Sequence, residues 1–171
     1  IVLLSISVLG FMVAVLVFGT LFKWLIMGRF QPRDAPMNFS TLFFIRYAAV
    51  TRLHIFIRAF VMHVLAGTVW MPLFQLMNGA SVSLSALLYS PAVFDYDLVT
   101  IDDHAVVDRG AFMFGHVLKN RVLTLGPSRL GIQATLGPHA VCFAHDHIND
   151  KGALGAFSSC FPGQSVPSDE Y

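Results

Sequence analysis

Apolar residues fill most of the first half of the chain, in two stretches. From Ile1 to Phe22 no residue is charged. A helix of this length covers roughly 33 Å, enough to cross a hydrocarbon core of about 30 Å. A secretory signal has a shorter apolar core after a basic start, so the pattern predicts a membrane-spanning helix. The residues that follow are those expected to snorkel or anchor at a membrane interface: Lys23, Trp24, Arg29 and Arg33.

The second apolar stretch, residues 59–77, is uncharged and contains His63 and Pro72. Residues 39–57 before it carry Arg46 and Arg52 among aromatic residues. We expect a second spanning helix from about Ala59, with 39–57 lying at the headgroups. The alternative is that residues 39–77 pack as buried helices against a neighbouring domain. In either case, we expect His63 to be a hydrogen-bonded structural histidine rather than a proton relay or a substrate contact.

In the second half, apolar residues recur at every sixth position, which is the signature of a parallel β-helix. Small residues follow four places later, where such a coil is narrowest, and glycines directly after the apolar positions suit tight corners. We therefore predict a left-handed parallel β-helix over 79–171, after transmembrane and interfacial helices over 1–78. The apolar positions are Val82, Leu88, Phe94, then Ile101, Val107, Met113, then Leu130, Leu136, Cys142, Ile148, Leu154, Cys160 and Val166.

The repeat is interrupted once, because seventeen residues separate Met113 from Leu130 where eighteen would keep the register. Residues 114–129 are therefore predicted to leave the coil as a loop or hairpin, and loops on a rigid scaffold often carry function. This segment contains His116, Lys119 and Arg121.

Two cysteines, Cys142 and Cys160, lie eighteen residues apart, so they stack one coil above the other. That spacing is near disulfide reach, but buried reduced thiols are the favoured interpretation. Two histidines flank a carboxylate in His145-Asp146-His147, yet no further ligands are evident, so no metal site is predicted.

The composition points to lipid: 56% of the residues are hydrophobic, 12% are charged, and the mean hydropathy is +0.67. Six of eleven basic residues lie between 23 and 58, whereas nine of ten acidic residues lie from Asp95 onward. Because the basic residues are embedded among apolar ones, we expect a bilayer with anionic headgroups as the partner, and no nucleic acid. Since the first residue is Ile1, we expect the chain to be part of a longer protein.

Residues 20–165 resemble the membrane-embedded terminal region of nonribosomal peptide synthetases of the ε-poly-lysine synthetase type. The chain departs from that family in three places. Gly115 stands where a threonine is common, Lys119-Asn120 replaces an acidic pair, and the first coil, Val82 to Ser85, lacks the usual basic and glycine residues. The residues that carry the resemblance are Asp97 to Asp102, Gly115-His116-Val117, Arg121-Val122 and Gly126-Pro127, with Lys23-Trp24, Gly28-Arg29, Gly67-Thr68 and Asn78-Gly79-Ala80 upstream.

The resemblance implies an acyltransferase-like domain that transfers an acyl or aminoacyl group from a thioester to an amine or hydroxyl. We expect His116 to be the general base, Asp97 to orient its imidazole, and backbone N–H groups of the loop's glycines to bind the oxyanion. Arg121 and Lys119 are candidates to bind the phosphate of a phosphopantetheine-carrier thioester or acyl-CoA donor, and no tightly bound cofactor is expected. Adenylation and carrier domains, in the same protein or another chain, are the implied partners.

Two alternatives stay open. The chain is a non-catalytic membrane scaffold or docking module, or it is an acetyl-CoA-dependent O- or N-acetyltransferase. The basic stretch favours a cytoplasmic connection between the apolar segments, but two crossings then place the β-helix on the far side. The resemblance favours the cytoplasmic side.

Overall fold

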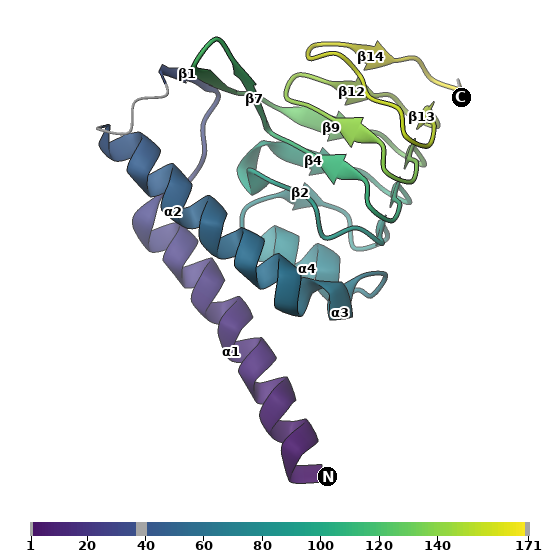
Figure 1. Ribbon diagram of the computed structural model, residues 1–171. Helices are drawn as coiled ribbons and strands as arrows, with labels where there is room; N and C mark the ends of the chain where they lie inside the picture. The colour runs from purple at the N-terminus through teal and green to yellow at the C-terminus, as the bar shows by residue number, and fades with distance from the viewer. Residues whose placement is uncertain (1, 37–40, 170–171) are drawn as a thin grey trace.

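The computed structural model describes residues 2–36 and 41–169. Figure 1 shows a long helix, one short strand and further helices, followed by a series of short strands. Residues 1, 37–40 and 170–171 lie outside the described residues. The start of the predicted 39–57 segment and the outer ends of the predicted 1–78 and 79–171 regions fall there.

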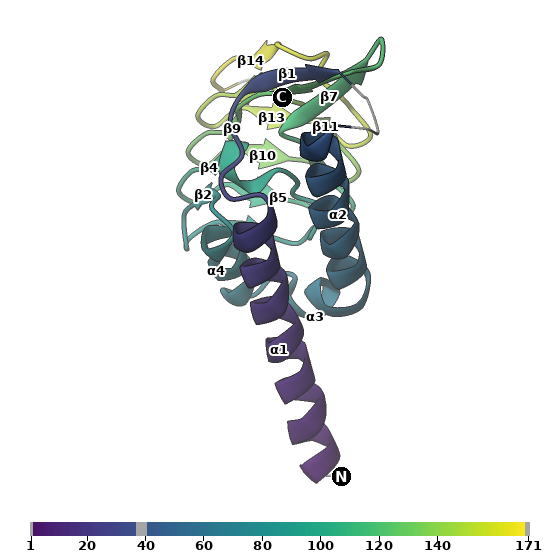
Figure 2. The ribbon, with the colours of Figure 1, turned by 90° about the vertical axis from the view of Figure 1, so that its left-hand side faces the viewer.

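The first helix, α1, runs from Val2 to Ile26. Figures 1 and 2 both show its N-terminal half extending away from the rest of the molecule. Large apolar side chains on this half are exposed, including Leu9 and Phe11. Its C-terminal half packs on the protein, where Thr20 and Lys23 are buried. Two helices, Ile6–Ile26 and Leu42–Leu65, are long and apolar enough to cross a membrane.

The second long helix begins earlier than predicted. Helix α2, Leu42–Ile57, continues through a π-helical segment, η1, Arg58–Met62, into α3, His63–Leu65. Gly67 follows with φ +74° and donates its N–H to Leu88 O, which turns the chain onto the strands. Helix α4, Trp70–Met77, is separate. The predicted helix from Ala59 through residue 77 is therefore wrong, because this turn interrupts it.

Eleven short strands pair in parallel in three sheets. The first sheet contains β2 Ser81–Val82, β4 Val99–Ile101, β9 Ser128–Leu130, β12 His147–Ile148 and β14 Ser165–Val166. The second contains β3 Leu87–Leu88, β5 Val106–Val107, β10 Thr135–Leu136 and β13 Ala153–Leu154. The third contains β6 Phe112–Met113 and β11 Val141–Cys142.

The registers repeat at nearly the same offset before and after the hairpin, and the offset is twenty-nine where the hairpin is inserted, as between Ile101 and Leu130. Leu130 pairs with Ile148, and Ile148 with Val166, each eighteen residues on; Leu136 pairs with Leu154 at the same offset. The offset is nineteen from Val82 to Ile101. These registers support the predicted left-handed parallel β-helix, which stays a prediction.

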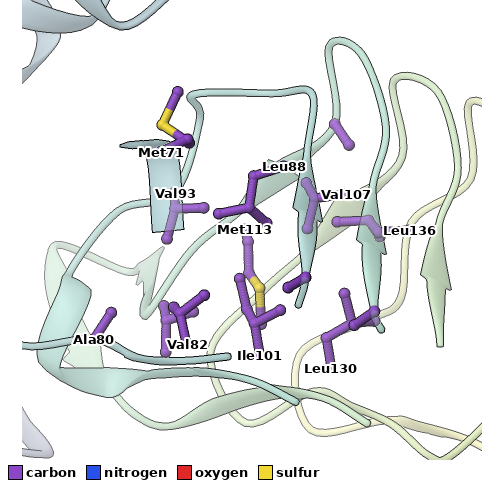
Figure 3. Packing of buried hydrophobic residues seen from close by; sticks show 14 of the residues in the cluster. Met71, Ala80, Val82, Leu88, Val93, Ile101, Val107, Met113, Leu130 and Leu136 are labelled. Atoms are coloured by element: carbon purple, nitrogen blue, oxygen red, sulfur yellow. The ribbon is translucent and has the colours of Figure 1, made fainter. Parts of the chain in front are cut away.

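The paired apolar residues form one core between the sheets (Figure 3). Residues at the small positions, such as Ala105 and Ala134, are fully buried. One position differs from the prediction: Val93 is buried and bridges to Met113, whereas Phe94 is partly exposed. Val93 is five residues after Leu88 and eight residues before Ile101, so the period of six is broken on both sides of Val93, and Phe94 faces outward.

The corners of the repeat do not lie at the glycines that follow the apolar positions. Backbone φ is positive three places after those positions, at every sixth residue from Gln133 to Asp169, and most of these residues are not glycine. Gly131 and Gly137 serve a different purpose. A Cβ on either would lie 2.7 Å from backbone atoms of the next repeat, so these glycines allow close stacking.

The segment 114–129 contains an antiparallel hairpin, β7 His116–Lys119 and β8 Val122–Leu125. Strand β1, Arg33–Pro36, comes directly after α1 and pairs with β8. A small cluster under this sheet includes Phe30, Val50 and Leu123. A 3₁₀ turn, η2, Tyr96–Leu98, directly precedes β4.

Candidate functional site

His116 is the first residue of the hairpin. It pairs with Leu125, and Gly126 N–H donates to Gly115 O at 2.9 Å, which fixes the base of the hairpin. The side chain of His116 is 24% exposed, so the imidazole is held by the protein and still open to a ligand.

The imidazole is oriented by a carboxylate and a phenol. Asp95 Oδ2 contacts His116 Nδ1, and the Tyr47 hydroxyl lies 3.2 Å from the same nitrogen. A carboxylate at Nδ1 favours the tautomer with its proton on that nitrogen. Nε2 then carries the lone pair and is able to accept a proton. The arrangement is the one a general base requires.

Asp95 is held with little freedom. Its side chain is 3% exposed and its backbone is left-handed, with φ 56°. Aspartate tolerates this conformation better than most residues, and such backbone is often found at functional sites. The 3₁₀ turn begins at the next residue, and Leu98 N–H donates to Asp95 O at 2.8 Å.

The prediction that Asp97 orients His116 is wrong by two residues. Because η2 turns the chain, Asp97 faces α1, and its Oδ2 lies 2.7 Å from Lys23 Nζ. Both side chains are fully buried, so Lys23 does not snorkel at an interface as its sequence position suggests. Phe30 N–H also donates to Asp97 Oδ2, at 3.0 Å.

Gly115 explains how Asp95 reaches the histidine. A Cβ on Gly115 would lie 2.8 Å from Asp95 Cβ and 3.0 Å from Leu98 Cβ. The family's threonine at this place would not fit the present arrangement. Of the two loop glycines expected to bind an oxyanion, Gly126 already donates its N–H to Gly115 O.

Lys119 and Arg121 lie at the tip of the hairpin and are exposed. Asn120 and Arg121 form the two-residue turn, both with positive φ, as in the tight turns that match strand twist. Lys119 is three residues along the strand from His116, which is roughly 10 Å. Their predicted role in phosphate binding stays a prediction.

An outward-facing aromatic column borders His116. Phe94 stacks on Phe114 with centroids 4.9 Å apart, and Phe114 stacks on Phe143 at 5.8 Å. The imidazole meets Phe114 edge to face at 5.1 Å. All three phenylalanines are partly exposed, so an apolar surface leads up to the imidazole. In the sequence, only the phenylalanines on either side of Met113 indicate an outward-facing apolar surface.

The His145-Asp146-His147 segment, considered as a metal site, contains one buried structural residue between two exposed ones. Asp146 is fully buried and accepts backbone N–H groups from Phe143 and Gly163, whereas His145 and His147 are exposed. Across the described ranges, no group of three or more His, Cys, Asp or Glu residues is placed to hold a metal ion.

The sequence also drew attention to the two cysteines and to His63. Cys142 and Cys160 are free buried thiols, and burial raises the pKa of both. His63 is exposed, and its role as a hydrogen-bonded structural histidine stays a prediction. A different histidine, His54, is buried and has hydrogen bonds to Val50 O and Asn78 Oδ1.

One comparison with curated proteins gives a match. The chain is 24% identical over 150 residues to the delta-poly-L-ornithine synthetase of Acinetobacter baumannii (strain AB307-0294). The matched part covers 86% of this chain. It covers 11% of that synthetase, so the chain spans a small part of its relative's length. No protein-family model and no solved structure matches the chain.

Proposed function

We propose that this chain is an acyltransferase-like domain of a membrane-bound enzyme that joins amino acids, related to the poly-amino-acid synthetases. The observation that carries the proposal is the contact of His116 Nδ1 with the buried carboxylate of Asp95. The similarity to a poly-ornithine synthetase supports amino-acid ligation as the setting.

The proposed step transfers an aminoacyl group from a thioester. Nε2 of His116 accepts a proton from the attacking amine while the amine nitrogen bonds to the carbonyl carbon. The carbon–sulfur bond then breaks, and the imidazolium returns its proton to the departing thiolate. Asp95 stabilises the imidazolium by its negative charge, and the Tyr47 hydroxyl contacts the same ring nitrogen, Nδ1. Adenylation and carrier domains are the proposed source of the thioester.

Replacing His116 tests this proposal. A pantetheine thioester of ornithine and an amine acceptor are supplied to the chain in neutral detergent, and thiol release and amide product are measured. We expect His116→Ala to lower the rate by about 100-fold or more, the usual contribution of a general base. His147→Ala, an exposed histidine on β12, is the matched control and retains the rate.

The same experiment separates the alternatives. Equal product with and without His116 would support a non-catalytic scaffold. Turnover of acetyl-CoA in place of the aminoacyl thioester would support an acetyltransferase.

We further propose that the N-terminal half of α1 anchors the chain, with the sheets and α2 on one side of the bilayer. Strand β1 pairs with β8, so the connection between the two long helices lies beside the sheets. Helix α2 contacts the strand region at both ends, since Tyr47 contacts His116 and Ile57 lies in the core. If α2 crossed, the edges of the sheets would enter the hydrocarbon, where unpaired backbone groups are costly.

The charge of α2 supports this arrangement. Arg52 is exposed near the middle of Leu42–Leu65, a depth at which a charge would be costly in a bilayer. The basic connection then favours the cytoplasmic side for the sheets as well. Protease should cut at the exposed hairpin tip in inverted membrane vesicles and not in intact cells. Cleavage only from outside the cell would overturn this topology.

A further inference from the structure

A basic pocket lies between the end of the second long helix and the first strand repeats. It has a volume of about 600 Å³. Its lining includes Arg58 from η1, Arg109 from the corner after β5, and His63 from α3, with Tyr89 and Phe112 opposite. Segments far apart in sequence thus bring two guanidinium groups and an imidazole to one cavity.

The cationic groups of this pocket lack a matching anion. None of the lining residues carries a carboxylate. In the part of the chain that the structure describes, no ion pair involves Arg58 or Arg109. The guanidinium of Arg58 instead lies 4.2 Å from the centroid of the Phe94 ring. A nearby acid, Asp108, accepts the backbone N–H of Arg109.

We infer that this pocket binds the phosphate of a phosphate ester. The planar guanidinium matches the oxygens of a phosphate, and two of them provide both charge and directed hydrogen bonds. The π-helical segment is a further sign of function, because such segments are often found at binding sites. Here it begins at Arg58 itself.

The pocket is connected to the candidate active site through the aromatic column. The ring of Phe94, on which Arg58 lies, is 6.4 Å from His116. The guanidinium and the imidazole are therefore no farther apart than 4.2 Å and 6.4 Å taken together. Phe112 lines the pocket and stacks on Phe114, which meets the imidazole.

This path suits a thioester donor that carries its phosphate on a flexible arm, as phosphopantetheine does. The phosphate occupies the basic pocket, the arm crosses the phenylalanines, and the thioester meets His116. This assignment rests on the proposed function. A lipid headgroup has the same phosphate chemistry, and the exposed Phe60 and Val64 of the adjoining helix place lipid within reach of the pocket.

Binding to the full chain, purified in neutral detergent, tests the inference by calorimetry. The probes are 4′-phosphopantetheine against pantetheine, and dioctanoyl phosphatidate against dioctanoylglycerol. For the thioester source, the phosphorylated probe binds more tightly than pantetheine. We expect Arg58→Gln and Arg109→Gln each to reduce this preference about tenfold, the loss of one charge-assisted contact.

The controls distinguish this pocket from other basic residues. Arg52→Gln, on α2 but outside the pocket, is the control and retains the preference. Arg121→Gln tests the hairpin tip as the competing phosphate site, and it lowers the preference only if the phosphate binds there. Arg109 is exposed, so its replacement does not endanger folding. His116→Ala retains binding even though it removes activity, so failure of the proposed function and failure of the pocket give different results.

Three outcomes are informative. Preference for 4′-phosphopantetheine that depends on both arginines supports the donor path. The same dependence for phosphatidate alone supports a phosphate site and overturns its link to the thioester. No phosphate preference for either probe pair, or loss of the preference in Arg121→Gln but not in Arg58→Gln and Arg109→Gln, overturns the inference.

Discussion

Asp95 directly precedes the 3₁₀ turn η2 and Asp97 lies within it, and the surroundings of the two aspartates are opposite. Asp95 meets a partly exposed imidazole and a phenol, whereas Asp97 meets a lysine in a fully buried pair. The hairpin side is open to a reactant; the helix side is closed and joins α1 to the sheets. An aspartate can therefore orient a catalytic group or hold two elements together. Which of these it does here depends on the backbone conformation of a three-residue turn.

The largest expected effect is a loss of stability when the ion pair on the helix side is broken. Asp97→Asn leaves the charge of Lys23 buried and unpaired, which costs about 3–5 kcal/mol of unfolding free energy. Lys23→Met together with Asp97→Asn removes both charges, retains an acceptor for Phe30 N–H, and should recover most of the loss. Denaturant unfolding of the single and double variants measures both effects. Equal stability of Asp97→Asn and the unmodified chain would refute the role given to the pair.

The next effect is on rate, on the hairpin side. Asp95→Asn retains the size of the side chain but removes the charge that stabilises the imidazolium, so thioester transfer should slow about 100-fold, roughly 2.7 kcal/mol of activation free energy. Because the imidazole is partly exposed, unfolding should change far less than in Asp97→Asn. A larger loss of rate in an equally folded Asp97→Asn would reverse the assignment of the two carboxylates.

The smallest effects come from two glycines, each of which makes room for one of the aspartates. A Cβ at Gly79 would lie 2.1 Å from Asp97 Oδ1, and φ is +102° there, so Gly79→Ala should lower stability by about 1–3 kcal/mol. Gly115→Ala displaces Asp95 and should slow transfer about tenfold. Gly155→Ala is the control, since its nearest neighbour would lie 3.6 Å away, and neither quantity should change. Rate and unfolding measured on all three variants check the comparison.

The stacked strands were easier to predict than the site, because each repeat has the same steric requirement. Leu130, Leu136 and Ile148 occupy equivalent inward positions, and the period makes them visible in sequence. Val93 and Phe94 are both apolar, so composition does not show which one faces inward. The excursion of residues 114–129 was evident as a break in register, although its pairing with β1 was not.

The site was only partly predictable, since it depends on contacts between distant segments. His116 was identified from the loop and the resemblance. Asp95 and Asp97 differ only in backbone conformation, and the positive φ of Asp95 has no sequence signal. Tyr47 comes from a helix sixty-nine residues away from His116, and no local pattern indicates that pairing. Helix α2 was divided wrongly because Arg46 and Arg52 suggested a boundary, whereas they lie on its exposed face.

With α1 anchored in a bilayer as proposed, the ion pair between Lys23 and Asp97 connects the membrane helix to the turn beside the candidate site. Next to this ion pair, Trp24 Nε1 donates to Met77 O at 2.9 Å. The C-terminal end of α1 is therefore fixed to the rest of the protein and moves with the sheets. A membrane thinner or thicker than α1 requires is accommodated by tilting the helix. Tilting would displace Asp97 and the backbone of η2, which directly follows Asp95. We therefore expect the lipid chain length to change the orientation of the His116 ring and the rate of acyl transfer.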